Sequence, residues 1–389
     1  MTNIENIKGW CYRNLKGDPV IWFIVFVLSL FSIVVVYSAT GSLAYRMEGG
    51  DTEHYLIKQS AHVLLSLLAM WVAHRIDYRY YANISRLLLW ISVPLLLFTW
   101  HYGTNMNEAS RWLTIPVLNR EWQPSDLAQL ALLITLASML SKRQKNIKDF
   151  QRAITPMLLW IGLICGLIAM TNISTAVLLF LTCMLLLFLG RVPTKYLAML
   201  IVIGCFAGTA AIILGQRGET AMHRIEQWVN GETTFQAEQA YIAIASGGVV
   251  GKGPGQSQQR NYLPHPYSDF VYAIILEEYG LVGGIIVLLL YLALLYRGMN
   301  AAYNSDRPYG GLLSAGLSFA LVLQAMVNMG VAVGLGPITG LPLPLLSMGG
   351  TSQLFTGVSL GIIISVSRGN NERMVKKVKK QYAEVPVAA

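Results

Sequence analysis

Long apolar runs recur from one end of this chain to the other, with polar stretches between them. About ten of them approach the roughly 20 residues that an α-helix needs to cross the hydrocarbon core of a bilayer. They fall at 20–38, 55–73, 85–103, 124–140, 154–170, 175–190, 196–214, 269–296, 310–332 and 352–367. The run at 124–140 is the weakest, because Asp126 and Gln129 lie in its first turns. The pattern predicts an all-α integral membrane protein with about ten transmembrane helices.

The distribution of basic residues gives these helices an orientation. If the first polar segment is cytoplasmic and the helices alternate in direction, 21 of the 29 Lys and Arg residues fall in inside segments. An excess of Lys and Arg marks the cytoplasmic loops of membrane proteins. We therefore predict cytoplasmic termini, with a cytoplasmic segment over 1–19, a membrane domain over 20–367 and a basic cytoplasmic tail over 368–389.

Composition supports a membrane protein and argues against nucleic-acid-binding, disulfide-rich and metal-cluster proteins. Of the 389 residues, 54% are hydrophobic and 13% are charged, and the mean hydropathy is +0.50. The net charge of +9 follows from the membrane orientation and from a tail that we expect beside anionic lipid, so we predict no nucleic-acid binding. None of the four cysteines falls in an outside loop, which predicts no disulfide framework and no metal cluster. The first apolar run is long enough to span a membrane, and we expect it to be retained rather than cleaved as a signal peptide.

Two outside segments are long, at about 104–123 and 215–268, the second between the seventh and eighth helices. Long loops often carry function. In the second loop, Ile225, Trp228 and Val229 would share one face of an amphipathic helix, and 235–245 favours another helix lying against the membrane.

The most informative segment is NYLPHPYSDFVYAIILEEYG at 261–280. It places Asp269 where a polar loop becomes an apolar helix, and desolvation there would raise the pKa of its carboxyl group. Asp269 could act as a general base that deprotonates a sugar hydroxyl. The alternative is a residue of the helix entrance that stabilises the helix dipole, with Ser268 as a second candidate cap.

Glu277 and Glu278 follow about two turns later in the same apolar run. Acidic side chains are costly inside a bilayer and usually face the interior of the bundle or a polar cavity. They could contact substrate or a metal, or they could form an internal ion pair or hydrogen bonds that hold helices together.

Two other segments could bind an anion. GKGPGQ at 251–256 carries Lys252 and could bring backbone amides close to phosphate, although alone it also fits a flexible loop. Arg111 and Trp112 could form an anion site beside an interfacial aromatic ring, or simply belong to the aromatic belt at the membrane surface.

The segment that joins the last two helices, 333–355, contains too many prolines and glycines to be a regular helix. Irregular backbone at this depth is tolerated when it is buried in protein or lines a cavity. Gln324 and Asn328, one turn apart on the preceding helix, would face it. The residues there that would let a polar headgroup approach the backbone are Ser347, Gly349, Gly350 and Ser352.

Five segments in the same order resemble the SEDS (FtsW/RodA) family of cell-wall polymerases over nearly the whole chain. They are GDPVIWFIVFVLSLFSIVVVYSAT (17–40), SRWL…QPSD (110–126), QAYIAIASGGVVGKGPGQ (239–256), YLPHPYSDFVYAIILEEYGLVG (262–283) and QAMVNMGVAVGLGPITGLPLPLLSMGGTS (324–352). The segments RWL…QPSDLA and GSLAY…GG…TEHYL are more similar to the division-type members, those called FtsW, than to the elongation type.

The resemblance implies a ten-helix glycosyltransferase that polymerises lipid II into glycan strands at the outer face of the bacterial cytoplasmic membrane, expected at the division septum. It implies that Asp269 is the essential aspartate, with Arg111 and Lys252 as the family's arginine and loop lysine. It also implies a class B penicillin-binding protein as transpeptidase partner, and contacts with other membrane proteins of the division machinery. The predicted substrate contacts are Arg111, Trp112, Gln239, Lys252, Glu277, Glu278, Asn328, Ser347, Gly349, Gly350 and Ser352.

The chain departs from the family pattern at several positions, which are His265, Asp126, Gln129, Asn172 and Met348. The core of the Asp269 motif is unaffected. In the expected reaction, a lipid II hydroxyl attacks a strand carried on undecaprenyl diphosphate, without a nucleotide. No cofactor is required by the sequence, and a divalent cation, Mg or Mn, could share the diphosphate charge. The alternatives are an elongation-type polymerase, a lipid II flippase and a scaffold without catalysis.

Overall fold

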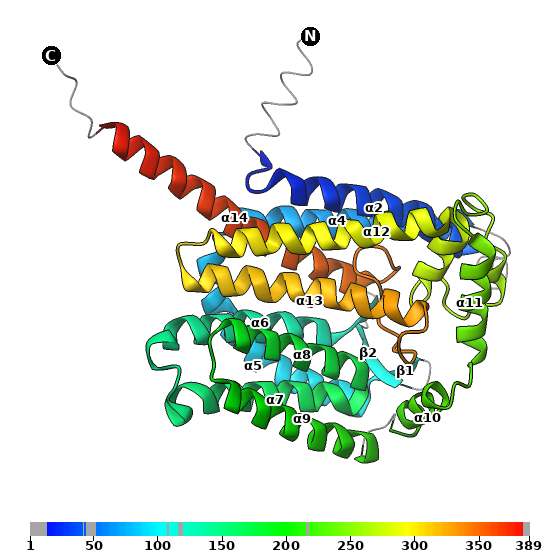
Figure 1. Cartoon of the computed structure of the whole chain (residues 1–389), viewed down its shortest axis with the longest axis horizontal. Helices are drawn as coiled ribbons and strands as arrows, with labels where there is room; N and C mark the ends of the chain where they lie inside the picture. The colour runs from blue at the N-terminus through cyan, green and yellow to red at the C-terminus, as the bar shows by residue number, and fades with distance from the viewer. Residues whose placement is uncertain are drawn as a thin grey trace, which may run out of the picture.

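The computed structural model describes residues 14–41, 43, 52–106, 109–115, 120–214 and 218–383. Within these residues, ten long helices form a bundle, and two shorter helices and a small sheet cover one end of it (Figure 1). The bundle helices are α2 (Pro19–Ala39), α4 (Thr52–Arg75), α5 (Tyr78–Tyr102), α6 (Pro124–Arg143), α7 (Thr155–Thr171), α8 (Ile173–Leu189), α9 (Thr194–Leu214), α12 (Val271–Tyr303), α13 (Pro308–Ala332) and α14 (Gly350–Ala383). Short helical turns occupy Gln144–Asn146, Phe150–Ile154 and Gln259–Asn261.

Each predicted membrane run corresponds to one of these helices, so the all-α membrane fold is confirmed. Within the described residues, nine helices are long and apolar enough to cross a membrane, and α8 is apolar but spans only 17 residues. The weak apolar signal of α6 has a physical explanation. Of the most apolar 18-residue stretch of α6, 72% is buried in protein, compared with 11% for α9. Helix α6 therefore packs against other helices rather than against lipid.

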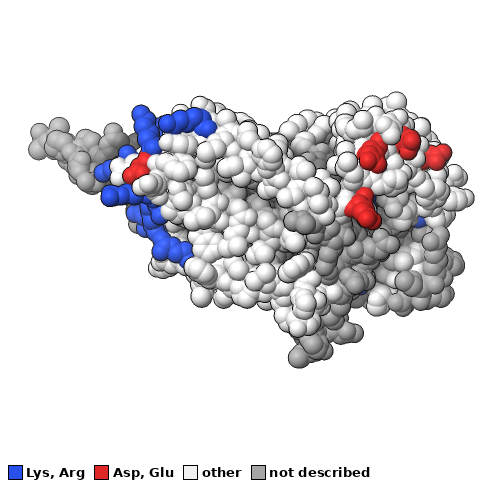
Figure 2. All heavy atoms as spheres, turned by 90° about the horizontal axis from the view of Figure 1, so that it is seen from below, with Lys and Arg blue, Asp and Glu red and all other residues white. Residues whose placement is uncertain are grey.

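The two ends of the bundle differ in charge. In Figure 1, α2 begins and α14 ends at the same end of the bundle. Figure 2 shows Lys and Arg gathered at that end, whereas most Asp and Glu on this face lie at the other end. This polarity agrees with the predicted orientation. Helix α14 continues to Ala383, so no break in secondary structure marks the predicted boundary at 367 and 368, and the three predicted segments stay a prediction.

Helices α4 and α14 approach closely because α14 carries glycine where they cross. A Cβ atom at Gly357 would lie 2.2 Å from the Ser66 main-chain oxygen, and one at Gly361 would lie 2.5 Å from that of Met70. Two glycines four residues apart allow such backbone contact between membrane helices. The Ser66 hydroxyl also donates to the Gln353 main-chain oxygen over 2.6 Å. This contact fixes the start of α14, where the irregular segment ends.

A buried ion pair joins the first helix to α12 at the basic end. Asp18 is 4% exposed, accepts a hydrogen bond from the Val20 amide as the cap of α2, and pairs with Arg297 over 2.6 Å. One carboxylate therefore serves both the dipole of α2 and its contact with α12.

The opposite end carries the outside segments. The first contains a three-stranded antiparallel sheet in the order β1 (Thr104–Met106), β2 (Ala109–Ile115) and β3 (Arg120–Trp122), which the sequence pattern did not predict. The second contains the two predicted helices, α10 (Gly218–Val229) and α11 (Phe235–Gly247). Ala240 and Ala243 of α11 are buried in an apolar cluster with residues at the start of α12, so α11 packs on protein with this face.

Candidate active site

Asp269 lies in a turn immediately before α12. The helix begins at Val271, and its N-cap residue is Phe270, which provides no side-chain cap. The half-buried Asp269 carboxylate accepts a hydrogen bond from the Ser268 hydroxyl over 3.0 Å. Neither predicted cap residue therefore caps α12. The Asp269 carboxylate is also in no salt bridge within the described part of the chain.

The backbone of this turn is held by three consecutive carbonyl groups. The main-chain oxygen of Tyr267 accepts from the Met348 amide over 2.8 Å, and that of Ser268 accepts from the Ser347 hydroxyl over 2.6 Å. The main-chain oxygen of Asp269 accepts from the Asn328 side chain over 2.9 Å. These donors come from α13 and from the 333–349 segment. Distant parts of the sequence therefore fix the direction from which the Asp269 side chain leaves the turn.

Asn328 and Ser347 were predicted to contact substrate, and both are 2% exposed. Asn328 also donates to the Leu341 main-chain oxygen over 2.7 Å, and the Ser347 hydroxyl accepts from the Leu343 amide over 2.8 Å. Gln324 donates to the Pro342 main-chain oxygen over 2.8 Å. The irregular segment is thus tied to α13, as predicted, and these polar side chains support the backbone.

Helix α12 is broken at Gly280, a break that the predicted membrane run over 269–296 did not include. Gly280 has φ 65° and ψ −170°, a conformation essentially restricted to glycine. A Cβ atom there would lie 2.3 Å from the Val249 main-chain oxygen. Glycine is common inside membrane helices and the run as a whole is strongly apolar, so hydropathy could not reveal the break.

The glycine-rich loop of residues 247–253 satisfies the backbone at the break. The amides of Lys252 and Gly253 donate to the main-chain oxygens of Glu277 and Glu278 over 3.0 and 2.9 Å. The amides of Leu281 and Val282 donate to the main-chain oxygens of Gly248 and Val249 over 3.0 and 3.2 Å. Backbone groups freed inside a membrane helix need such partners. The loop therefore completes the backbone hydrogen bonding of the broken helix.

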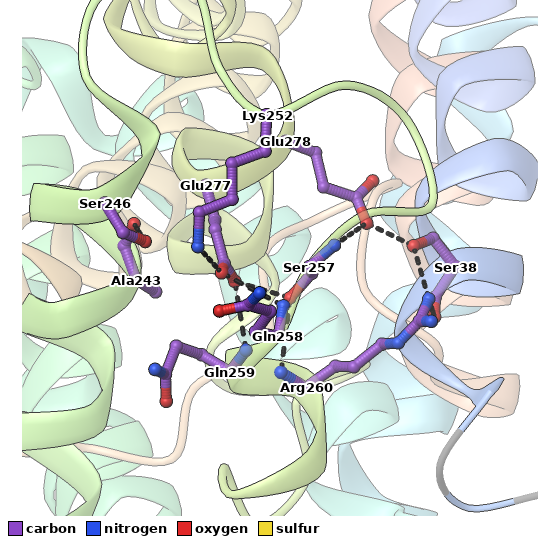
Figure 3. A network of polar contacts seen from close by, with 10 residues as sticks. All are labelled: Ser38, Ala243, Ser246, Lys252, Ser257, Gln258, Gln259, Arg260, Glu277 and Glu278. Carbon is purple, nitrogen blue, oxygen red and sulfur yellow. Dashed lines mark hydrogen bonds and ion pairs between the residues drawn. The ribbon is translucent and has the colours of Figure 1, made fainter.

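The side chain of Glu277 is fully buried and accepts four hydrogen bonds, one from Lys252 of this loop and three from residues 257–259 that follow it (Figure 3). Lys252 donates to it over 2.7 Å and the Ser257 hydroxyl over 2.5 Å. The amides of Gln258 and Gln259 donate over 3.0 and 3.3 Å. This is the internal ion pair that the sequence allowed as the alternative to substrate contact. The charge of Lys252 faces Glu277 in this structure.

Glu278 links the loop to the end of α2. Its carboxylate, 1% exposed, accepts from the Ser38 hydroxyl and, over 3.3 Å, from the Ser257 amide. Arg260 donates to the Ser38 main-chain oxygen over 3.0 Å, which closes the network drawn in Figure 3. Ser38 and Ser257 were not singled out from sequence, because small hydroxyl residues carry no distinctive pattern.

The other predicted contacts lie around the same end. Arg111 and Trp112 are on β2, and the Arg111 side chain is outside the described residues. Gln239 is half-buried on α11. Gly349, Gly350 and Ser352 are partly exposed at the start of α14. The structure therefore places these remaining residues at the same end of the bundle as Asp269, on β2, on α11 and at the start of α14.

Arg224 is a further cation near Asp269 that the sequence analysis did not single out. It lies on α10, is half-buried, and donates to the Ile338 main-chain oxygen over 3.1 Å. Burial lowers the pKa of its guanidinium, and the nearby Asp269 carboxylate acts in the opposite direction. In the sequence, Arg224 is one arginine beside the apolar face of a predicted amphipathic helix. An arginine in that position is equally typical of a solvent-exposed face, so the sequence did not distinguish it.

Comparison with known proteins adds the family. The family model described as "Cell cycle protein", which covers FtsW, RodA and SpoVE, matches residues 18–372. Stage V sporulation protein E of Bacillus subtilis is 31% identical over 367 residues, covering 92% of this chain and 98% of the relative. A protein named "Probable peptidoglycan glycosyltransferase FtsW" of Geobacter metallireducens is 33% identical over 362 residues, covering 91% and 96%.

Two solved structures share the fold. The rod shape determining protein RodA of Thermus thermophilus is 26% identical, with a TM-score of 0.67 and coverage of 91% of this chain and 97% of the other. A chain of a peptidoglycan synthase complex has a TM-score of 0.73 at 24% identity and the same 91% coverage of this chain, with 98% of the other covered. The fold and the site thus define a multi-pass membrane protein with a carboxylate held at one end of its bundle. This chain belongs to the FtsW/RodA/SpoVE family, the SEDS family.

Proposed function

We propose that this protein is a peptidoglycan glycosyltransferase that polymerises lipid II into glycan strands, with Asp269 as the general base. The observation that carries the proposal is the support of Asp269: its carboxylate caps no helix, while its backbone is fixed by donors from α13 and the 333–349 segment. Preorganised geometry of this kind is what a base needs at the moment of transfer. The names of the relatives support the same activity.

The proposed reaction transfers the growing strand from undecaprenyl diphosphate to lipid II. The 4-hydroxyl oxygen of the lipid II N-acetylglucosamine attacks the anomeric carbon of the strand, and its proton passes to the Asp269 carboxylate. The bond between the anomeric carbon and the diphosphate oxygen breaks, and the electron pair leaves with undecaprenyl diphosphate. Attack opposite the leaving group inverts the anomeric centre. Protein cations stabilise the charge that develops on the diphosphate. The family resemblance implies Arg111 and Lys252 for this role, and Lys252 is paired with Glu277 in this structure.

No step of this reaction is assigned to a bound metal. No group of three or more His, Cys, Asp or Glu side chains that could hold a metal ion occurs within the described residues. Mg²⁺ is commonly bound through one or two carboxylates together with substrate phosphates, so the diphosphate would supply part of the coordination of a cation that assists. Polymer formation in EDTA, compared with added Mg²⁺ or Mn²⁺, measures that contribution.

The proposed setting is septal wall synthesis in the bacterial cytoplasmic membrane, together with a class B penicillin-binding protein that cross-links the strand. Relatives named FtsW and SpoVE, and the structural likeness to a chain of a synthase complex, support this setting. An elongation-type role is the alternative. Rescue of cells depleted of their own division polymerase, compared with cells depleted of the elongation polymerase, separates the two roles.

The test of the activity is glycan formation from purified lipid II in detergent. The assay compares wild type with Asp269→Asn and with the control Glu219→Gln, each with and without the penicillin-binding partner. The control changes an exposed carboxylate on α10. We expect polymer from wild type and the control, and none from folded Asp269→Asn. Equal polymer from Asp269→Asn would remove the base from the mechanism. No polymer from wild type with its partner would favour a flippase or scaffold, since detergent has no two sides between which a flippase can transport.

A further inference from the structure

The position of α10 is fixed by the segment that also holds Asp269. Arg224 donates to the Ile338 main-chain oxygen over 3.1 Å, and one turn later the Trp228 indole donates to that of Gly334 over 3.3 Å. Both acceptors belong to the 333–349 segment, whose Ser347 and Met348 hold the Asp269 turn. The guanidinium and the carboxylate are therefore positioned relative to each other by one continuous piece of backbone.

The cations at this end of the bundle differ in what they already bind. Lys252 forms an ion pair with the buried Glu277, and Arg260 is part of the Ser38 and Glu278 network. Arg224, by contrast, donates a single hydrogen bond, to a neutral carbonyl group, and forms no ion pair within the described part of the chain. A guanidinium has five N–H donors in a planar fork. Arg224 therefore retains donors for an anion, and Lys252 does not offer a free charge.

The placement of Arg224 beside Asp269, without a salt bridge between them, suits transfer with inversion. The two charged groups interact electrostatically but are not paired as a salt bridge. In an inverting transfer the base and the leaving group lie on opposite sides of the anomeric carbon. A cation that serves the leaving group must then share the site with the base without forming a salt bridge to it, and Arg224 forms none with Asp269 within the described residues.

We infer that Arg224 is a substrate-binding residue that holds the diphosphate of the lipid-linked donor through its guanidinium fork. This inference rests on the proposed function and adds to it the cation that meets the leaving group. Guanidinium matches phosphate oxygens in a bidentate geometry that a lysine ammonium cannot reproduce. The C1–O bond to phosphate breaks heterolytically, and the negative charge that the diphosphate gains is stabilised by Arg224 while Asp269 takes the proton.

The test uses binding of farnesyl diphosphate and farnesyl monophosphate to the purified full-length protein in detergent, with polymer formation measured on the same samples. The variants are Arg224→Gln, Arg224→Lys, Asp269→Asn and the control His223→Gln, an exposed neighbour on α10. We expect Arg224→Gln to weaken diphosphate binding about tenfold to hundredfold, the range for charge-assisted hydrogen bonds. Monophosphate binding should weaken less, and Arg224→Lys should fall between wild type and Arg224→Gln. Asp269→Asn and His223→Gln should bind as wild type does.

The outcomes separate this inference from the proposed function. Unchanged diphosphate binding by folded Arg224→Gln overturns the inference, even if polymerisation falls. Arg224 would then act on Asp269, or bind a carboxylate of the stem peptide, which farnesyl diphosphate lacks. Loss of monophosphate and diphosphate binding to the same extent overturns it as well, because a displaced α10 would have that effect. Binding requires no turnover, so a wild type that makes no polymer refutes the proposed function while the binding result still decides the role of Arg224.

Discussion

The side-chain amide of Asn328 donates one hydrogen bond to the main-chain oxygen of Asp269 over 2.9 Å and another to that of Leu341 over 2.7 Å. One buried side chain on α13 therefore connects the Asp269 turn to the irregular segment that precedes α14. A predicted substrate contact becomes, in the structure, a support for the backbone of the proposed base. The distinction matters because a supporting residue and a binding residue respond differently to substitution.

Asn328→Leu should reduce polymerisation through a misplaced base. The substitution keeps the branching and the number of side-chain heavy atoms but leaves two carbonyl groups without their donor, which costs about 1–3 kcal/mol of stability for a buried group. A displacement of about 1 Å in a catalytic group can lower a rate by about 10²-fold. We expect a rate per folded molecule lower by about tenfold to hundredfold, with diphosphate binding retained, measured by polymer formation and thermal unfolding in detergent.

Gln324→Leu is the matched control, since Gln324 lies one turn earlier on α13 and donates to Pro342 without contacting the Asp269 turn. It should lower the unfolding temperature without a comparable loss of rate. Equal rates for the two folded variants would show that the bond from Asn328 to Asp269 does not position the base.

Gly280→Ala should destabilise the protein because both the backbone conformation and the space require glycine. The conformation costs a residue with a side chain about 1–3 kcal/mol, and the added Cβ atom would meet the Val249 main-chain oxygen at 2.3 Å. The loop of residues 247–253 must then move from the break. Thermal unfolding and hydrogen exchange at these loop amides measure the effect.

Gly166→Ala gives the comparison for Gly280→Ala, because Gly166 lies inside α7 and its added Cβ would meet nothing within 4 Å apart from the adjoining backbone of α7 itself. Alanine is favoured over glycine in a helix by about 1 kcal/mol, so this variant should be as stable as wild type or more so. Equal stability of the two variants would mean that the break in α12 tolerates a side chain.

The sequence predicted the helices better than it predicted the site, for a physical reason. A membrane helix is an apolar run of fixed length, so all ten could be located, and α6 was the weakest because protein surrounds it. The break at Gly280 has no hydropathy signal, since its backbone groups are satisfied by a loop about 30 residues earlier in the chain. Asp269 could be singled out because it stands alone at a polar-to-apolar boundary. The pairing of Lys252 with Glu277 could not be predicted in the same way, because it depends on how the loop of residues 247–253 folds onto α12.

Asp18→Asn should lower stability without lowering catalysis. Asparagine can still cap α2, so the substitution isolates the ion pair with Arg297. Removing a partner from a buried, charge-assisted hydrogen bond costs about 1–3 kcal/mol. The pair lies at the basic end of the bundle, opposite the Asp269 turn, so the polymerisation rate per folded molecule should equal that of wild type. A lower rate at full occupancy of the folded state would indicate coupling between the two ends.

Lys252→Met and Glu277→Gln, alone and together, decide between two roles for Lys252. Lys252→Met leaves the Glu277 carboxylate buried without its cation, which should cost about 3 kcal/mol. The double variant removes both charges, and much of the lost stability should return, as a double-mutant cycle followed by thermal unfolding can measure. If Lys252 only holds the loop on α12, polymerisation should recover together with stability. Recovered stability with polymerisation still absent would show that the Lys252 ammonium also serves the diphosphate, and that the pair with Glu277 opens during the reaction.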